Sequence, residues 1–193
     1  MRINVPNVII VDADYVDKVA FNLIVNFERI IGRRIPPADM ARWIDCIALD
    51  GGIRNGHNEV QIILLHSKNK KEMDNFTPSS FAEELDGKAF KDNLGEFLIS
   101  SLPVEGDMVD MEHLFCDSLM HICDEKDVRR VMAIPDCETY YDGVRHAARG
   151  VCDERVRLTV FTMESKTGGN FRQEILGYSL MSALGIRGDE IPR

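Results

Sequence analysis

The stretch that decides the fold is Val5-Pro-Asn-Val-Ile-Ile-Val-Asp-Ala-Asp14, a short apolar run that ends in two acids. Its first seven residues are rich in β-branched side chains and do not alternate with polar ones, which is typical of a strand buried on both faces. Apolar residues then follow at helical spacing from Asp14 to Ile31, and Gly32 is a stop signal. A buried strand followed directly by a helix is the opening unit of an α/β fold.

The rest of the chain repeats this alternation. It predicts four further strands and five further helices, the strands at 60–65, 96–101, 128–134 and 156–161, and the helices at 36–51, 79–85, 107–123, 138–149 and 171–184. This order predicts three α/β/α layers around a mostly parallel, five-stranded, Rossmann-like sheet. Because we find no internal repeat and no linker, we expect a single domain over 1–193.

Charge, cysteine spacing and the length of the apolar runs exclude several classes of partner. With 23 basic and 32 acidic residues, the formal net charge is -9, so bulk charge does not favour binding to duplex DNA. The five cysteines contain no C-x-x-C pair, and the short apolar run near the N-terminus does not form a signal peptide. No stretch approaches the roughly 20 apolar residues of a membrane span. We therefore expect a cytoplasmic protein with reduced thiols and no membrane partner.

Acids follow several of the expected strands. Asp12 and Asp14 end the first strand, and Asp136 and Glu138 follow the fourth. In open α/β sheets, ligands bind at the carboxyl ends of the strands, where the strand order reverses. If the first and fourth strands are neighbours, these acids meet, and clustered carboxylates suit Mg²⁺ or Mn²⁺. The alternative for each acid is capping of the helix that follows it.

The helix expected at 107–123 adds two candidates. Asp110 and Asp117 are seven residues apart and therefore share one side of that helix. The alternative is a solvated helical face. The full set of candidate metal ligands is Asp12, Asp14, Asp110, Asp117, Asp136 and Glu138.

Three motifs resemble a known family. They are Asp12-Ala13-Asp14-Tyr15 after the first strand, Val109 to Leu114 (VDMEHL), and Val131 to Glu138 (VMAIPDCE) with Gly150 downstream. Their order is similar to that of NYN domains, which belong to the PIN-like superfamily of metal-dependent ribonucleases. The resemblance implies a PIN-like fold in which Asp12, Asp110, Asp136 and Glu138 are catalytic. They would hold Mg²⁺ or Mn²⁺ for attack of water on an RNA phosphodiester, with Asp14 as an auxiliary acid.

Two other functions stay open. Tyr15, Pro135 and Thr139 depart from the family motifs, so the chain is alternatively a non-catalytic, PIN-like interaction scaffold. Nine methionines and an apolar last helix would also fit a homo-oligomer. Asp12-x-Asp14 further resembles the first motif of haloacid-dehalogenase-like phosphatases, with Ser67 as the second motif and one of Lys68, Lys70 or Lys71 as the lysine.

RNA is the partner that the nuclease hypothesis implies, and it requires local positive charge. Clusters that would supply it are Arg33-Arg34, Lys68 to Lys71, Arg129-Arg130, and the pair Arg145 and Arg149. The alternative is ordinary surface charge.

Overall fold

The chain opens with the buried strand and helix that the sequence predicts. In the computed structural model, which describes residues 3–105, 110–151 and 154–192, all six residues of β1 (Asn7–Asp12) are buried. Helix α1 (Ala13–Ile31) follows at once, and the Asp12 side chain caps it by accepting the backbone N–H of Tyr15. The helix ends at Gly32, whose φ of 70° lies in the left-handed region that glycine tolerates.

The remaining elements continue the alternation. They are β2 (Ala38–Asp39), α2 (Met40–Asp50), β3 (Asn58–Ser67), β4 (Phe76–Thr77), the π-helical turn η1 (Phe81–Leu85), β5 (Ala89–Lys91), β6 (Gly95–Val104), α3 (Met111–Asp124), β7 (Arg130–Ile134), α4 (Tyr141–Ala148), β8 (Arg157–Thr162), β9 (Arg172–Ile175), α5 (Leu176–Ala183) and the 3₁₀ turn η2 (Gly188–Glu190).

The main sheet has seven strands in the order β5-β6-β3-β1-β7-β8-β9, and β2 pairs with β4 in a separate two-stranded sheet. All neighbours in the main sheet are parallel except β5, which runs antiparallel to β6. From β1 the chain builds outward through β3 to β6 and then crosses to β7 on the other side of β1. The strand order therefore reverses between β1 and β7, as the sequence hypothesis required.

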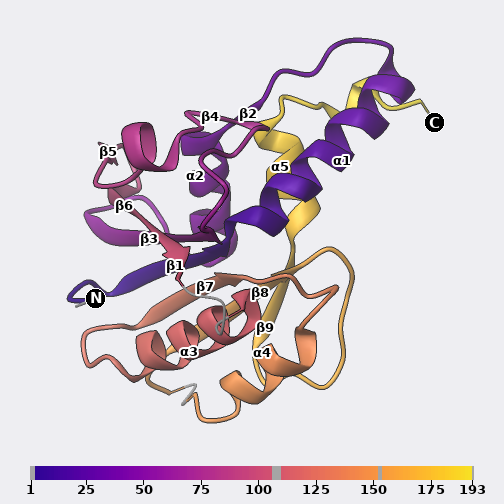
Figure 1. The fold of residues 1–193 in the computed structure, drawn as a ribbon. Helices are drawn as coiled ribbons and strands as arrows, with labels where there is room; N and C mark the ends of the chain where they lie inside the picture. The colour runs from indigo at the N-terminus through magenta and orange to yellow at the C-terminus, as the bar shows by residue number, and fades with distance from the viewer. Residues whose placement is uncertain (1–2, 106–109, 152–153, 193) are drawn as a thin grey trace.

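Each face of the sheet has its own apolar cluster. Ile9 and Val11 of β1 pack into one cluster, together with residues of α1, α2 and α5. Val8 and Ile10 point to the opposite face and pack with residues of α3 and α4. Figure 1 shows the same division, with α1, α2 and α5 on one side of the sheet and α3 and α4 on the other. In the described residues, no helix combines the length and apolarity that crossing a membrane requires.

Four expectations about the elements were wrong. Helix α2 begins at Met40 rather than at residue 36, because residues 38–39 pair with β4. The sheet has seven strands rather than five, because β5 and β9 add short edge strands. Residues 172–175, expected within the last helix, instead pair with β8 and satisfy the backbone groups along its edge, so α5 begins only at Leu176. Helix α4 begins at Tyr141 rather than near Glu138, because residues 136–140 form a turn.

Two sequence expectations fall partly outside the described residues. Val109 and the expected helix start at 107 lie there, as does Cys152. The other four cysteines are free thiols.

Candidate functional site

A cavity of about 360 Å³ lies at the carboxyl ends of β1 and β7, where the strand order reverses. Four of the six candidate ligands line it, namely Asp12, Asp14, Asp110 and Asp136. Asp117 and Glu138 do not line it. The remaining lining residues are Tyr15, Lys18, Met111, Glu112, Thr139 and Tyr140.

Asp12 is the most buried acid of the cavity, with 3% of its surface exposed. Its Oδ1 accepts the backbone N–H of Tyr15 at 3.0 Å, and its Oδ2 accepts the Tyr140 hydroxyl at 2.6 Å. Burial raises the pKa of Asp12 to about 6, and the charges of Asp14 and Asp136 act in the same direction, while the two hydrogen bonds oppose them. A cation in the cavity would reverse this balance, because it favours the ionised carboxylate.

Asp14 lies on the first turn of α1 and faces the end of β3. Its Oδ2 accepts the backbone N–H of Ser67 at 3.0 Å and also the Ser67 hydroxyl. Its Oδ1 is buried and has no hydrogen-bond partner among the described residues. A buried carboxylate oxygen without a donor is costly, so this atom is a natural ligand for a cation in the cavity.

Asp136 organises the turn that follows β7. Its Oδ1 accepts the backbone N–H groups of Glu138 and Thr139, both at 3.0 Å, and its Oδ2 accepts the Thr139 hydroxyl at 2.8 Å. The turn leaves Glu138 exposed outside the cavity. Glu138 instead lies near Tyr15, whose pKa it raises together with burial. Of the two acids that follow β7, only Asp136 therefore lines the cavity, and Glu138 does not.

Asp110 and Glu112 reach the cavity from the start of α3. Asp110 caps this helix, accepting the backbone N–H of His113 at 2.9 Å and lying 2.7 Å from His113 Nδ1. These contacts lower the pKa of Asp110 and raise that of His113, although both side chains are largely exposed. Glu112 packs against α4, since a Cβ on Gly143 would lie 2.5 Å from Glu112 Oε1. Asp117 is exposed two turns further along α3.

Sequence reasoning proposed none of the six other lining residues as site residues, and three of these, Lys18, Glu112 and Tyr140, carry polar groups that bear on the site. Lys18 follows Asp14 by four positions and therefore shares its side of α1, which is a signal that the sequence offered. Glu112 lies two residues after Asp110, and at helical spacing the two side chains do not share one side of the helix. Tyr140 carried no signal, because only the folded turn brings its hydroxyl to Asp12.

The donor set of this cavity fits a hard divalent cation. It consists of carboxylate oxygens from β1, α1, α3 and the turn after β7, with Lys18 as its one basic lining residue. Within the described ranges, however, no three Asp, Glu, His or Cys side chains already stand in an arrangement that would hold a metal ion. Binding would require the carboxylates to exchange some of the hydrogen bonds described above.

A second cavity, of about 390 Å³, lies at the ends of β3 and β6, and Ser67 connects it to Asp14. It is lined by His66, Lys68, Lys70, Lys71, Phe81, Ala82, Asp86, Ser101, Pro103 and Glu105. The lysines lie on the loop after β3. The buried Asp17 holds this loop in place, because its carboxylate accepts hydrogen bonds from Lys70 Nζ at 2.5 Å and from the backbone N–H of Asn75 at 2.9 Å. Lys70 is thereby neutralised, whereas Lys68 and Lys71 have no ion-pair partner within the described residues.

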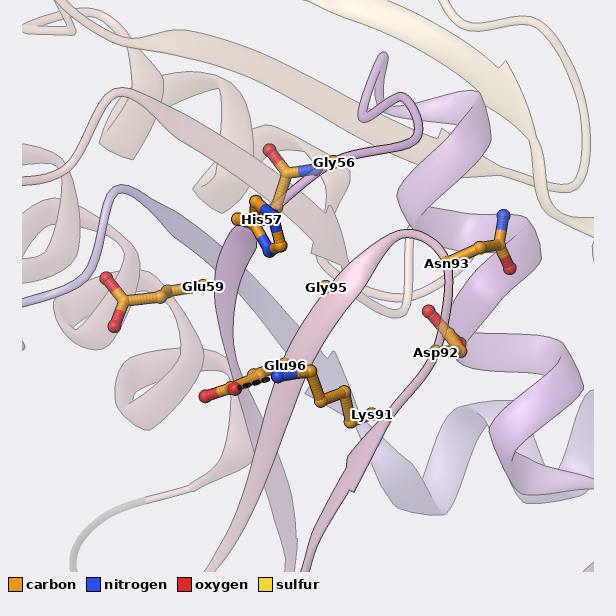
Figure 2. A pocket seen from close by; sticks show the side chains of 9 residues that line it. Gly56, His57, Glu59, Lys91, Asp92, Asn93, Gly95 and Glu96 are labelled. Carbon is orange, nitrogen blue, oxygen red and sulfur yellow. Dashed lines mark hydrogen bonds and ion pairs between the residues drawn. The ribbon is translucent and has the colours of Figure 1, made fainter.

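A third cavity, of about 380 Å³, opens at the opposite edge of the sheet, beside the turn between β5 and β6 (Figure 2). Its lining includes His57, Glu59, Asp92 and the ion pair between Lys91 and Glu96, whose charged atoms lie 2.7 Å apart. In Figure 2, the Glu59 side chain points away from Asp92. Because the polar groups do not converge, this cavity offers no catalytic arrangement.

Several of the expected basic clusters have internal partners. Arg33 forms an ion pair with Glu190, and Arg145 contacts Asp142 and the carbonyl of Gly168. Arg129 donates to the carbonyls of Lys126 and Val128. Lys68 and Lys71, like Lys18 inside the acidic cavity, have no ion-pair partner within the described residues.

Comparison with known proteins assigns the chain to a family. Residues 3–191 match the model of a family of unknown function, DUF6621, and the protein therefore belongs to that family. No curated protein and no solved structure shows a significant match to it.

Proposed function

We propose that this protein is a divalent-cation-dependent phosphodiester hydrolase that acts on RNA, with the three-layer arrangement of PIN-like nucleases. The observation that carries the proposal is the convergence of Asp12, Asp14, Asp110 and Asp136 on one cavity at the strand-order reversal. Helices that pack through apolar residues on both faces of the sheet support the fold part of the proposal.

Each polar residue of the cavity has its own role in this proposal. Asp12, Asp14 and Asp136 hold Mg²⁺ or Mn²⁺, and Asp110 adds a ligand from the opposite wall of the cavity. The ion, when bound, supplies an activated water and neutralises charge on the phosphoryl group. Tyr140 orients Asp12 through its hydroxyl, and Lys18 offers a positive charge to a substrate phosphate. Glu138 and Asp117 lie outside this set, and we propose no direct role for them.

Positive charge beside the cavity favours RNA as the substrate. A chain of net charge -9 needs local cations to accept a polyanion, and Lys68 and Lys71 supply them in the adjoining cavity. Ser67 links the two cavities through its bonds to Asp14. We propose a cytoplasmic location, which is consistent with the free thiols of the described cysteines.

Metal binding is the direct test. Titration with Mn²⁺ should raise the melting temperature, because an ion that binds only the folded state stabilises it by about 2.7 kcal/mol at a hundredfold excess over its Kd. Asp12→Asn should abolish both this response and hydrolysis of single-stranded RNA, whereas Asp117→Asn, outside the cavity, should retain both. An absent Mn²⁺ response in the unmodified protein would refute the metal-dependent function.

A non-catalytic scaffold is the second candidate. It is favoured by the internal hydrogen bonds that already engage both oxygens of Asp12 and of Asp136. Such a scaffold could self-associate through Phe21 and Val25 of α1, which are exposed by 53% and 38%. It would show no Mn²⁺ response and no hydrolysis. The phosphatase alternative has less support, because Asp17 rather than a catalytic acid engages Lys70.

A further inference from the structure

Four arginines gather at the edge of the sheet opposite the acidic cavity. Arg130 begins β7 and is paired in register with Arg157, which begins β8. Arg172 begins β9, the next strand, and Arg54 follows α2. These four residues, here called the arginine cluster, thus come from four separate segments of the chain.

The guanidinium groups of Arg130 and Arg157 lie close together. A Cβ placed on Gly52 would be 2.4 Å from Nη1 of Arg130 and 3.3 Å from Nη1 of Arg157, so both groups flank this one glycine. Burial and the positive charges of Arg157, Arg54 and Arg172 lower the pKa of Arg130. The like charges therefore repel one another across a short distance.

No carboxylate compensates this charge within the described residues. None of the four arginines forms an ion pair there, although the chain as a whole carries a net charge of -9. Asp50 and Glu174 lie on neighbouring elements, but burial and Glu174 raise the pKa of Asp50, where a nearby arginine would lower it. An acidic protein thus leaves four arginines without an ion-pair partner among the described residues.

Helix capping accounts for only part of the cluster. Nη1 of Arg54 donates to the carbonyls of Leu49 and Ile53, and Nη1 of Arg130 donates to that of Gly51, all near the end of α2. Nε of Arg130, however, is buried without a partner. The side chains of Arg157 and Arg172 make no hydrogen bond to any described residue, so most donors of the cluster remain available.

We propose that the arginine cluster is a binding site for a multiply charged phosphate ligand. A cavity of about 430 Å³ adjoins it, lined by Arg157, Leu158, Asn170, Phe171 and Arg172. Guanidinium groups bind phosphate oxygens in a bidentate manner, and several together favour a ligand with more than one phosphoryl group. Such groups occur in small polyphosphate compounds and in nucleic-acid strands. The site lies away from the acidic cavity and is independent of the function proposed above.

Thermal unfolding with inorganic tripolyphosphate at low ionic strength tests the site. At a hundredfold excess over Kd, binding should raise the melting temperature by about 5–10 °C. The double variant Arg157→Gln/Arg172→Gln should lose this rise. Arg29→Gln, which removes an exposed arginine from α1, should keep it, and so should Asp12→Asn in the presence of EDTA. The last variant separates this site from the proposed metal site.

Without phosphate, the double variant should melt no lower than the unmodified protein, because it relieves repulsion between like charges. A short single-stranded oligonucleotide identifies the source of the phosphate. Binding of tripolyphosphate alone assigns the site to small phosphate compounds, and tighter binding of the oligonucleotide, also lost in the double variant, assigns it to nucleic acid. The proposal is overturned if neither ligand binds, or if the double variant responds like Arg29→Gln.

Discussion

At the scale of single residues, the acids of the cavity serve two purposes at once. Asp12 and Asp110 cap α1 and α3. Capping is the structural alternative that the sequence left open for Asp12, whereas for Asp110 that alternative was a solvated helical face. The same side chains line the cavity with Asp14, whose Oδ1 is still without a donor. A cap occupies one of the two oxygens of a carboxylate, so capping alone does not prevent ligand binding. In Asp12 the second oxygen accepts the Tyr140 hydroxyl, and a cation would share or displace that hydrogen bond.

Tyr140 is the residue that holds Asp12 in its buried position. Tyr140→Phe removes the 2.6 Å hydrogen bond to Oδ2 while keeping the ring, so we expect the pKa of Asp12 to rise further. Losing a buried hydrogen bond to a charged group should lower the free energy of unfolding by about 1.5–3 kcal/mol, measured by urea denaturation at pH 8.

Tyr141→Phe is the matched control, because the Tyr141 hydroxyl donates to the carbonyl of Thr167 at an exposed site. It should lower the free energy of unfolding by less than about 1 kcal/mol. If both variants lost the same free energy of unfolding, the hydrogen bond to Asp12 would contribute no more to stability than the exposed one.

At the scale of elements, local pattern predicts some segments well and others poorly. β1 and α1 were predictable because each carries an uninterrupted pattern, and their boundary at Asp12 and Ala13 coincides with the end of the β-branched run. β9 was not, because Arg-Gln-Glu-Ile at 172–175 becomes a strand only by pairing with β8. Likewise, the turn that Asp136 stabilises brings Tyr140 into the site, and no residue spacing in the sequence predicts this turn.

Asp45 joins α2 to the turn between β5 and β6. Its side chain is partly buried against Asp92, and burial together with this contact raises its pKa from 3.8 to about 7. The folded state therefore retains a proton that the unfolded chain releases near pH 4, so stability should fall as the pH rises from about 4 to 7.

Asp45→Asn should remove its share of this dependence, and the decline that remains comes from other acids, such as Asp12, whose pKa is also raised. We expect the variant to melt higher than the unmodified protein at pH 8 and about equally at pH 4, as followed by circular dichroism across that range. Asp127→Asn, at an exposed position, should leave the pH profile unchanged. A profile for Asp45→Asn that parallels the unmodified protein would contradict the shared burial of the two carboxyl groups.

At the scale of the whole molecule, the charge is divided among three places. Acids gather at the carboxyl edge between β1 and β7, lysines lie beside them at the ends of β3 and β6, and arginines gather at the opposite edge. The net charge of -9 therefore says little about any one surface. The sequence predicted the acids from their positions after strands, but the adjacency of β1 and β7 that unites them is a property of the topology.

This division makes the salt dependence of RNA binding informative. If Lys68 and Lys71 contact the strand, Lys68→Gln/Lys71→Gln should weaken binding to single-stranded RNA and reduce the slope of log K against log salt by about 1.4, since each lost phosphate contact removes about 0.7. Fluorescence anisotropy between about 50 and 200 mM salt, with Mg²⁺ held constant, measures both the affinity and the slope. Lys126→Gln, which removes an exposed lysine before β7, should leave the slope unchanged. A slope that is the same in all three proteins would place the RNA elsewhere, and binding that is insensitive to salt would favour the scaffold over the hydrolase.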